Sequence, residues 1–267
     1  MAVLGKKFEK VVILLSTGRT GTKALAQYFD TCYEQVRALH EPHPSRHLRV
    51  ASNRYLCKRL SKDDMVRILA KSRRRLFAAL SEPIYIESNH FLHGFLEALD
   101  ELFEAPKIIH IVRDPRTYVP SHLNHGTLRG LKGLAARYYP FWMIKPDHYE
   151  TNPKKRWRQM SHPERMAWRW KTINAELNRG KSLFGSRYLR VRFEDTFAKN
   201  GSGLDRVTDW IGLPRNPRLL AEANRQKVNV SRYSYCPPWQ QWNPALKQLV
   251  IAHCRDLMEL YGYSTEI

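Results

Sequence analysis

Apolar runs of strand length, separated by stretches with helical periodicity, constrain the fold of this 267-residue chain more than any other feature. Runs rich in Ile and Val are typical of strands buried on both faces of a parallel sheet. Their alternation with helices predicts an α/β protein, a three-layer sandwich around a central parallel sheet, and the length suits a single domain over residues 1–267. The expected strands cover residues 10–15, 36–40, 84–88, 107–112 and 188–193.

Two helices are predicted in the second half of the chain. Ser161 and Glu164 have the spacing of a capping box, with Pro163 in the first turn, and a last helix is expected over residues 244–261. Between the fourth strand and the first of these helices, residues 126–160 show little periodicity and many aromatic side chains. Irregular segments of this length are often lids or binding loops, and the alternative is a surface insertion whose aromatic residues only pack down.

The charge of the chain indicates an anionic partner. Lys and Arg number 45 against 25 Asp and Glu, which gives a formal net charge of +20. A positive charge of this size attracts nucleic acid, anionic membranes or phosphate-rich small molecules, and by itself it does not distinguish among these partners. The basic stretches RRR (73–75) and KKRWR (154–158) are expected to be solvated faces, although the second can attract an anionic ligand.

The N-terminus lacks the layout of a signal peptide, and its apolar run over residues 11–15 is too short to span a membrane. We therefore expect a cytoplasmic protein without a transmembrane segment. The four cysteines are scattered, which favours reduced thiols over a zinc site or a disulfide framework.

The sequence STGRTGTKAL (16–25) follows the first strand and predicts an anion-binding loop. Gly18 and Gly21 allow a tight turn, and a helix that begins near Gly21 or Thr22 directs N–H groups and its dipole toward an anion. Arg19 can bind phosphate oxygens with its planar fork. The Walker A pattern fails, because Thr22 and Lys23 stand where Lys and Ser or Thr are required.

A second anion-binding element follows the fourth strand, in IVRDPRTYVPS (111–121). Arg113 is placed to end the strand, Pro115 to open a helix, and Ser121 to lie a little over two turns along it. Arg113 and Ser121 can then face one ligand at the carboxyl edge of the sheet, where open α/β sheets bind ligands.

Together the two elements resemble those of the sulfotransferases that use 3′-phosphoadenosine-5′-phosphosulfate (PAPS). In that family the first loop holds the 5′-phosphosulfate, and an Arg-Asp-Pro motif with Ser eight residues after the Arg holds the 3′-phosphate. VRFEDTF (191–197) is similar to the family's strand ending in Tyr-Glu-Asp, with Phe193 in place of Tyr, and LDRVTDWIGLP (204–214) to the helix that follows. The resemblance implies a P-loop-like fold and sulfuryl transfer without a metal ion.

The resemblance also suggests two candidates for the general base. Glu41, in HEPHP (40–44), looks like the Glu-Pro element of carbohydrate-type and bacterial sulfotransferases. His90, in ESNHF (87–91), lies where cytosolic small-molecule sulfotransferases carry a catalytic His. Because the chain lacks the Pro-Lys-x-Gly-Thr-Thr loop and the C-terminal Arg-Lys-Gly segment of that cytosolic type, we favour Glu41, with His90 as a second base or acceptor contact.

The expected catalytic residues are thus Glu41, Arg19 and His90. The expected donor contacts are Thr17, Gly18, Arg19, Thr20, Gly21, Thr22, Lys23, Arg113, Ser121 and Phe193, with Lys227 and Arg232 suggested by position and charge. A hydroxyl or amine would accept the sulfuryl group. A carbohydrate, a lipid headgroup, a phenol or a peptide tyrosine would each fit as the acceptor. The Glu41 resemblance favours a carbohydrate or glycolipid alcohol, and residues 126–160 would lie on the acceptor side.

Two alternatives remain at this point. A nucleotide-dependent kinase would share the fold class and the first loop, but the missing Walker residues and the Arg113–Ser121 element argue against it. A basic nucleic-acid-binding protein would explain the charge, but no helix-turn-helix, zinc-finger or RNA-binding aromatic signature supports specific binding.

Overall fold

The computed structural model describes residues 7–198, 201–215 and 234–267. Within these ranges the centre of the molecule is a five-stranded, fully parallel sheet with the strand order β2-β3-β1-β4-β5. The strands are β1 (Lys10–Ser16), β2 (Val36–His40), β3 (Ile84–Ser88), β4 (Lys107–Val112) and β5 (Tyr188–Arg192). The predicted fold class is confirmed. The fifth strand is one residue shorter than predicted, because Phe193 begins the short helix α10 (Phe193–Thr196).

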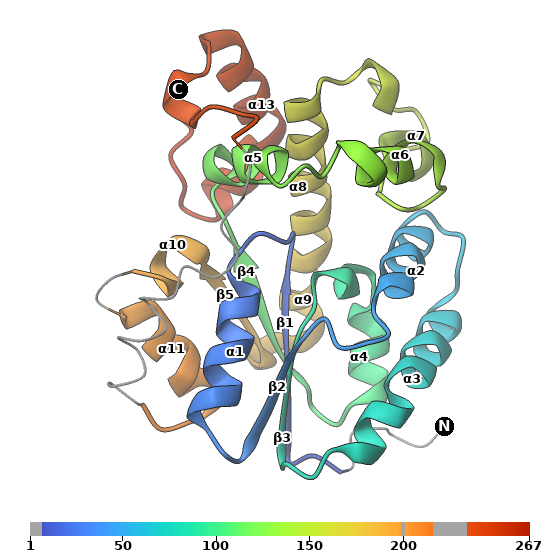
Figure 1. The fold of residues 1–267 in the computed structure, drawn as a ribbon, viewed down its shortest axis with the longest axis vertical. Coiled ribbons are helices and arrows are strands. Elements are labelled where there is room, and N and C mark those ends of the chain that lie inside the picture. Colours follow the sequence, from blue (N-terminus) through green and yellow to red (C-terminus); the bar gives the residue numbers. More distant parts are fainter. Residues whose placement is uncertain (1–6, 199–200, 216–233) are drawn as a thin grey trace.

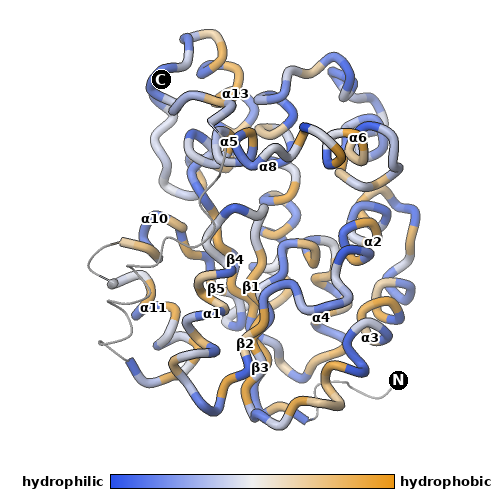
Figure 2. Tube along the Cα trace, viewed as in Figure 1, coloured by the Kyte–Doolittle hydropathy of each residue, from blue (hydrophilic) through white to orange (hydrophobic). Residues whose placement is uncertain are grey.

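The sheet buries both of its faces, as its Ile- and Val-rich strands predict. Alternate residues of β1 enter two separate cores: Ile13 and Leu15 point to the larger one, Val12 and Leu14 to the smaller one. Helices α1 (Thr22–Cys32) and α11 (Ser202–Ile211) cover the smaller core, and α2 (Arg46–Leu56), α3 (Lys62–Ala79), α4 (Leu96–Leu102) and α8 (His162–Asn178) cover the larger one (Figure 1). Hydrophobic residues accordingly concentrate along the central strands (Figure 2).

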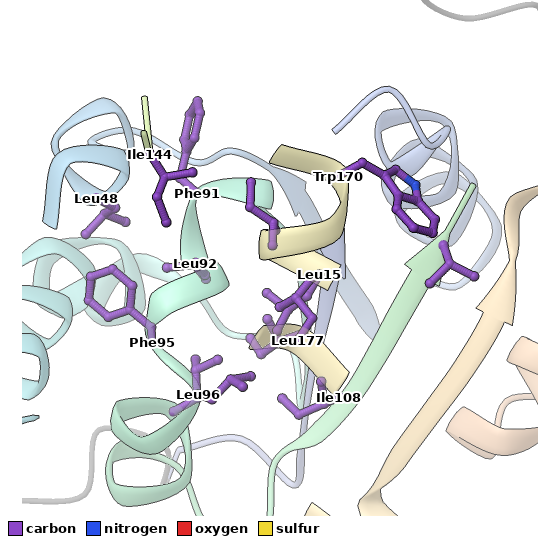
Figure 3. Close-up of a cluster of buried hydrophobic side chains, with 14 of the residues drawn as sticks. Leu15, Leu48, Phe91, Leu92, Phe95, Leu96, Ile108, Ile144, Trp170 and Leu177 are labelled. Atoms are coloured by element: carbon purple, nitrogen blue, oxygen red, sulfur yellow. The ribbon is translucent and has the colours of Figure 1, made fainter. Parts of the chain in front are cut away.

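The larger core joins the sheet to α8 through big side chains. Figure 3 shows Leu15, Phe91, Phe95, Trp170 and Leu177 within it, each no more than 3% exposed. Burial of one such side chain stabilises the fold by about 1.5–3 kcal/mol, so this core holds α8 firmly against the strands. The last helix, α13 (Pro244–Leu260), packs on α8 and ends one residue before the predicted boundary.

The predicted cap of α8 is confirmed. The Ser161 hydroxyl accepts a hydrogen bond from the N–H of Glu164, the Glu164 carboxylate accepts from the N–H of Ser161, and Pro163 lies in the first turn. Helix α3 begins with an equivalent box, formed by Ser61 and Asp64. Each cap satisfies N–H groups that the first turn of a helix leaves without a partner.

Residues 126–160 are more regular than the sequence predicts. They contain α6 (Gly130–Tyr138), α7 (Pro146–Tyr149) and the 3-10 turn η2 (Trp157–Gln159), which lie beyond the sheet beside α5 and α2 (Figure 1). Lys155, within KKRWR, forms an ion pair with Glu164. The other described elements are the 3-10 turn η1 (His90–Gly94), α5 (Pro115–Asn124), α9 (Gly180–Phe184), η3 (Gly185–Arg187) and η4 (Trp239–Gln241).

One basic run is placed differently from the prediction. Arg74 and Arg75 are exposed, but Arg73 is fully buried and forms an ion pair with Glu87 of β3. The expectation of a solvated face is therefore wrong for Arg73, because this position of α3 faces the sheet. In the described part of the chain, no helix is both long enough and apolar enough to cross a bilayer.

Candidate active site

The carboxyl ends of β1, β2, β3 and β4 open into a cavity of about 600 Å³. β1 is bordered by β3 on one side and β4 on the other, so the strand order reverses at β1. A crevice forms at such a point because the connections from neighbouring strands leave in opposite directions. The cavity therefore lies where the fold itself opens a ligand site.

The loop after β1 forms one wall of the cavity. Gly18, Arg19 and Gly21 have φ angles of 84°, 58° and 70°, and a loop with left-handed residues turns successive N–H groups toward one side. Helix α1 begins at Thr22, as predicted, and its first N–H groups have no partner inside the helix. A wall of this geometry suits an anion.

Gly21 is required by packing as well as by its backbone angle. A Cβ atom at this position would lie 2.3 Å from the ring of Phe197 and 3.1 Å from that of Phe193. The helix N-terminus therefore approaches α10 so closely that a larger residue would displace the loop.

Two hydroxyl groups in the loop lack internal partners. The Oγ1 atoms of Thr17 and Thr20 are buried and make no hydrogen bond to any described residue, and both residues line the cavity. Buried hydroxyls are normally hydrogen-bonded, so a ligand with acceptor oxygens would fit these donors. The residues of the loop therefore suit a phosphate or sulfate group.

The second predicted anion element contacts the first one directly. Arg113 follows the end of β4, and its Nη1 donates to the carbonyl oxygen of Arg19 at 2.6 Å. Ser121 lies on α5, and its Oγ accepts from Nε of Arg19 at 3.3 Å. Arg19 thus joins the two elements, which the sequence places about a hundred residues apart.

Further contacts hold Arg113 in place. Its Nε donates to Oγ1 of Thr117 at 3.0 Å, and its guanidinium carbon lies 4.5 Å from the ring centre of Phe193, a cation–π distance. Burial lowers the pKa of Arg113 and that of Arg19, but both stay charged at neutral pH. The carboxylate of Asp114, the next residue in the Arg-Asp-Pro motif, forms its ion pair with Arg116 at 2.6 Å and not with Arg113.

Glu41 lies just past β2 and also lines the cavity. Its φ of 47° is unusual for a residue other than glycine, and its N–H donates to the carbonyl of Ser88 at 2.8 Å. Left-handed backbone at a non-glycine residue costs about 1–3 kcal/mol and is concentrated at functional sites. The backbone is therefore strained at the residue that the sequence favours as the base.

His90 binds the Glu41 carboxylate. The two are joined by Nδ1 of His90 and Oε1 of Glu41 at 2.6 Å, and Nε2 of His40 lies 3.6 Å from the same oxygen. Burial by itself would raise the pKa of Glu41, but the hydrogen bond and charge of His90 outweigh it and hold the pKa below its ordinary value. The His90 ring also lies against Gly18, where an added Cβ would be 3.3 Å from its Cδ2. The carboxylate–imidazole pair is thus adjacent to the anion-binding loop.

A buried polar network fixes the position of this pair. Asn89 caps the turn that carries His90: its Oδ1 accepts from the N–H of Phe91 at 3.0 Å, and its Nδ2 donates to Glu87 at 2.8 Å and to Ser45 at 3.1 Å. Arg73 binds both oxygens of the Glu87 carboxylate, at 2.8 and 2.5 Å. The network therefore ties β3 and α3 to the turn that follows Glu41.

The structure brings most of the predicted residues to one cavity. Ser121 reaches the site through Arg19, whereas Lys227 and Arg232 lie outside the described residues. The predicted residues that line the cavity are Thr17, Gly18, Arg19, Thr20, Gly21, Thr22, Lys23, Glu41, His90, Arg113 and Phe193.

Sequence reasoning missed several other residues that line the cavity. Arg49 on α2 and Arg169 on α8 carry no motif, and only the aromatic density of residues 126–160 pointed toward Trp142. The lining residues that were not predicted include Arg46, Arg49, Asn53, His93, His122, His125, Lys132, Trp142 and Arg169. Within the described ranges, no group of three or more His, Cys, Asp or Glu side chains is arranged to hold a metal ion.

Comparison with known proteins agrees with this geometry. A model of the sulfotransferase family matches residues 12–217. A sulfotransferase domain from the curacin biosynthetic pathway superposes with a TM-score of 0.56 at 16% identity, over 96% of this chain and 98% of that one. A sulfotransferase from Alicyclobacillus acidocaldarius gives 0.55 at 14% identity, over 96% and 97% of the two chains. Mouse sulfotransferase SULT7A1, complexed with PAP (adenosine 3′,5′-bisphosphate), gives a TM-score of 0.54 at 14% identity, over 94% of this chain and 85% of that one. No curated protein matches the sequence significantly.

The family model matches more than three quarters of this chain. The chain therefore belongs to the sulfotransferase family, and it is an enzyme of sulfuryl transfer.

Proposed function

We propose that this sulfotransferase takes its sulfuryl group from PAPS and passes it to a hydroxyl or amine group of an acceptor. One observation carries the choice of donor: Arg19 contacts both Arg113 and Ser121, so two anion-binding elements meet at one cavity. PAPS carries anionic groups at both its 5′ and 3′ positions, and a donor with two such groups suits two linked elements. The similar mouse enzyme was crystallised with PAP, the desulfated product of this donor.

The loop would hold the 5′-phosphosulfate and Arg113 the 3′-phosphate, with Ser121 beside them and Phe193 packed on Arg113. In the reaction the acceptor oxygen forms a bond to sulfur while the bond from sulfur to the phosphate oxygen breaks. The bond electrons leave with the phosphate, so PAP gains negative charge. Arg19, Lys23 and the N–H groups at the start of α1, which line the cavity, would stabilise that charge, and such preorganised electrostatics are a main source of catalysis.

Glu41 would accept the proton of the attacking hydroxyl. A carboxylate whose pKa is held low is deprotonated at neutral pH and therefore ready to act as a base. His90 binds the same carboxylate, orients it, and is the second candidate for the proton acceptor. The Glu-Pro pattern favours an alcohol of a carbohydrate or glycolipid, with residues 126–160 on the acceptor side.

Ligand binding and turnover test this proposal together. Titration with PAP is expected to raise the melting temperature, because a ligand that binds only the native state stabilises it, whereas ATP with Mg²⁺ has little effect. Transfer of radiolabelled sulfate from PAPS should then be screened against sugars, phenols and aliphatic alcohols. A clear shift with ATP and none with PAP would contradict the proposed donor.

A further inference from the structure

The cavity contains more positive charge than the donor needs. Seven Lys and Arg side chains of the described residues line it, against a single carboxylate, that of Glu41. Three of the seven, Arg19, Lys23 and Arg113, belong to the proposed donor side. The remaining four come from α2, α6 and α8: Arg46, Arg49, Lys132 and Arg169.

Arg49 is held by aromatic rings. Its guanidinium carbon lies 4.2 Å from the ring centre of Phe91 and 4.4 Å from that of Trp142. Within the described residues it makes no ion pair and no side-chain hydrogen bond. Stacking fixes the plane of a guanidinium and leaves its N–H edge available for a planar or tetrahedral anion. Arg49 is therefore oriented in the manner of a binding residue.

Arg169 approaches the same region from α8. Its Nε and Nη1 atoms are buried and have no hydrogen-bond partner among the described residues. Burial and the charge of the nearby Arg169 lower the pKa of Arg49 to about 10, so Arg49 remains charged at neutral pH. Two like charges held in one partly buried space are costly unless an anion lies between them or beside them.

The groups that face these arginines supply no such anion. His93 and His122, which also line this part of the cavity, have their pKa values lowered by burial and are neutral. Glu41 is close enough for its charge to act on Arg49, but its carboxylate is bound by His90. The counter-ion that the two arginines need is thus a ligand, and it would lie next to the base.

We propose that Arg49 and Arg169 form an anion subsite for the acceptor. The acceptor then carries a carboxylate, sulfate or phosphate close to the hydroxyl that Glu41 deprotonates, and the rings of Phe91 and Trp142 border it. This inference rests on the proposed function and narrows its acceptor class, for example to uronic acids or to sugars that already bear sulfate or phosphate.

A binding experiment separates this inference from the donor assignment. The protein is first saturated with PAP, which tests the donor site alone, in chloride buffer free of phosphate and sulfate. Phenyl phosphate and benzyl alcohol are then titrated into the complex by calorimetry. Phenyl phosphate is expected to bind and benzyl alcohol is not. Arg49→Gln and Arg169→Gln are each expected to weaken phenyl phosphate binding by about tenfold or more, since a hydrogen bond to a charged group contributes roughly 1.5–3 kcal/mol.

Arg54→Gln is the matched control. It removes the same charge from the same helix, but Arg54 is exposed and does not line the cavity, so binding is expected to match the wild type. If PAP binds but phenyl phosphate does not, the subsite is disproved while the donor site stands. Equal affinity in the wild type, Arg49→Gln and Arg169→Gln would disprove it as well.

Turnover distinguishes the possible anionic groups. Acceptors are compared in pairs that differ only in the anion: 4-nitrophenyl β-glucuronide with the β-glucoside for carboxylates, and glucose 6-phosphate with glucose for phosphates. For each pair that reacts, kcat/KM should favour the anionic member, and Arg49→Gln should remove most of that preference. If Arg49→Gln lowers kcat equally for both members, the arginine serves the transferred sulfuryl group, and the acceptor subsite is refuted.

Discussion

Two glutamates near the ends of neighbouring strands differ in how completely their charge is satisfied. Glu87 of β3 is 1% exposed, and both of its oxygens are bound by Arg73, Tyr85 and Asn89. Glu41, just past β2, lines the cavity on strained backbone, and its closest partner is the imidazole of His90. The first carboxylate has little capacity left for a substrate, whereas the second is accessible to one.

The difference separates a carboxylate whose hydrogen bonds are all made within the protein from one that can still bind a substrate. A buried ion pair with all of its hydrogen bonds made positions the elements around it, but it cannot exchange a proton easily. An incompletely bonded carboxylate in a cavity costs stability and remains available for chemistry. The same contrast applies to the cations, since Arg73 is fully paired whereas Arg49 and Arg169 have no described carboxylate partner.

The largest expected effect is on turnover, in Glu41→Gln. Loss of the proposed base should lower kcat by about 10²–10⁴-fold, the range typical of general-base catalysis, with a melting temperature close to that of the wild type. The measurement is steady-state sulfuryl transfer together with thermal unfolding. Near-normal turnover in Glu41→Gln, combined with a large loss in His90→Ala, would transfer the role of base to His90.

For the buried ion pair between Arg73 and Glu87, we expect a loss of stability. Arg73→Met leaves Glu87 buried without its cation and should lower the free energy of unfolding by about 3–5 kcal/mol. Urea unfolding measures this loss. The double variant Arg73→Met, Glu87→Gln should recover part of it, because the uncompensated charge is gone. A change below about 1 kcal/mol in Arg73→Met would show that the two glutamates do not differ as described.

Arg113 offers an intermediate case, a half-buried cation whose partners are a carbonyl and a hydroxyl. Arg113→Ala should reduce the preference for PAP over adenosine 5′-monophosphate by about 10–100-fold, since charge-assisted hydrogen bonds contribute roughly 1.5–3 kcal/mol. Calorimetric titration of both nucleotides gives the ratio. Arg116→Ala is the control, because Arg116 pairs with Asp114 and does not line the cavity. Unchanged discrimination in Arg113→Ala would refute the 3′-phosphate contact.

The smallest expected effect is a shift in pH dependence. The hydrogen bond and charge of His90 lower the pKa of Glu41 against the opposing effect of burial. In His90→Ala only burial and weaker charges remain, so the pKa of Glu41 should rise. The acid limb of the kcat/KM profile should then move to higher pH by about one unit, equivalent to about 1.4 kcal/mol. A limb that stays in place, or that moves to lower pH, would contradict the coupling of the two residues.

Local sequence patterns determined the strands, the loop after β1 and the Arg113–Ser121 element. The apolar runs predicted all five strands to within one residue, because a strand buried on both faces needs apolar side chains at consecutive positions. Gly21 was predicted for the turn that starts α1, where its φ is 70°. Such signals depend on a few neighbouring residues, so they can be read without knowing the rest of the fold.

Tertiary structure alone decided which charges are paired and which face the cavity. The sequence predicted Arg73 as part of a solvated basic run, but α3 places it against Glu87. Arg169 belongs to no sequence motif, and only the packing of α8 brings it close enough for its charge to act on Arg49. The environment of a charged side chain depends on what lies within a few ångströms of it, and here those neighbours come from distant parts of the chain. The sequence predicted which loop would bind an anion, whereas the packing of α2, α3 and α8 decided which charged side chains are paired and which line the cavity.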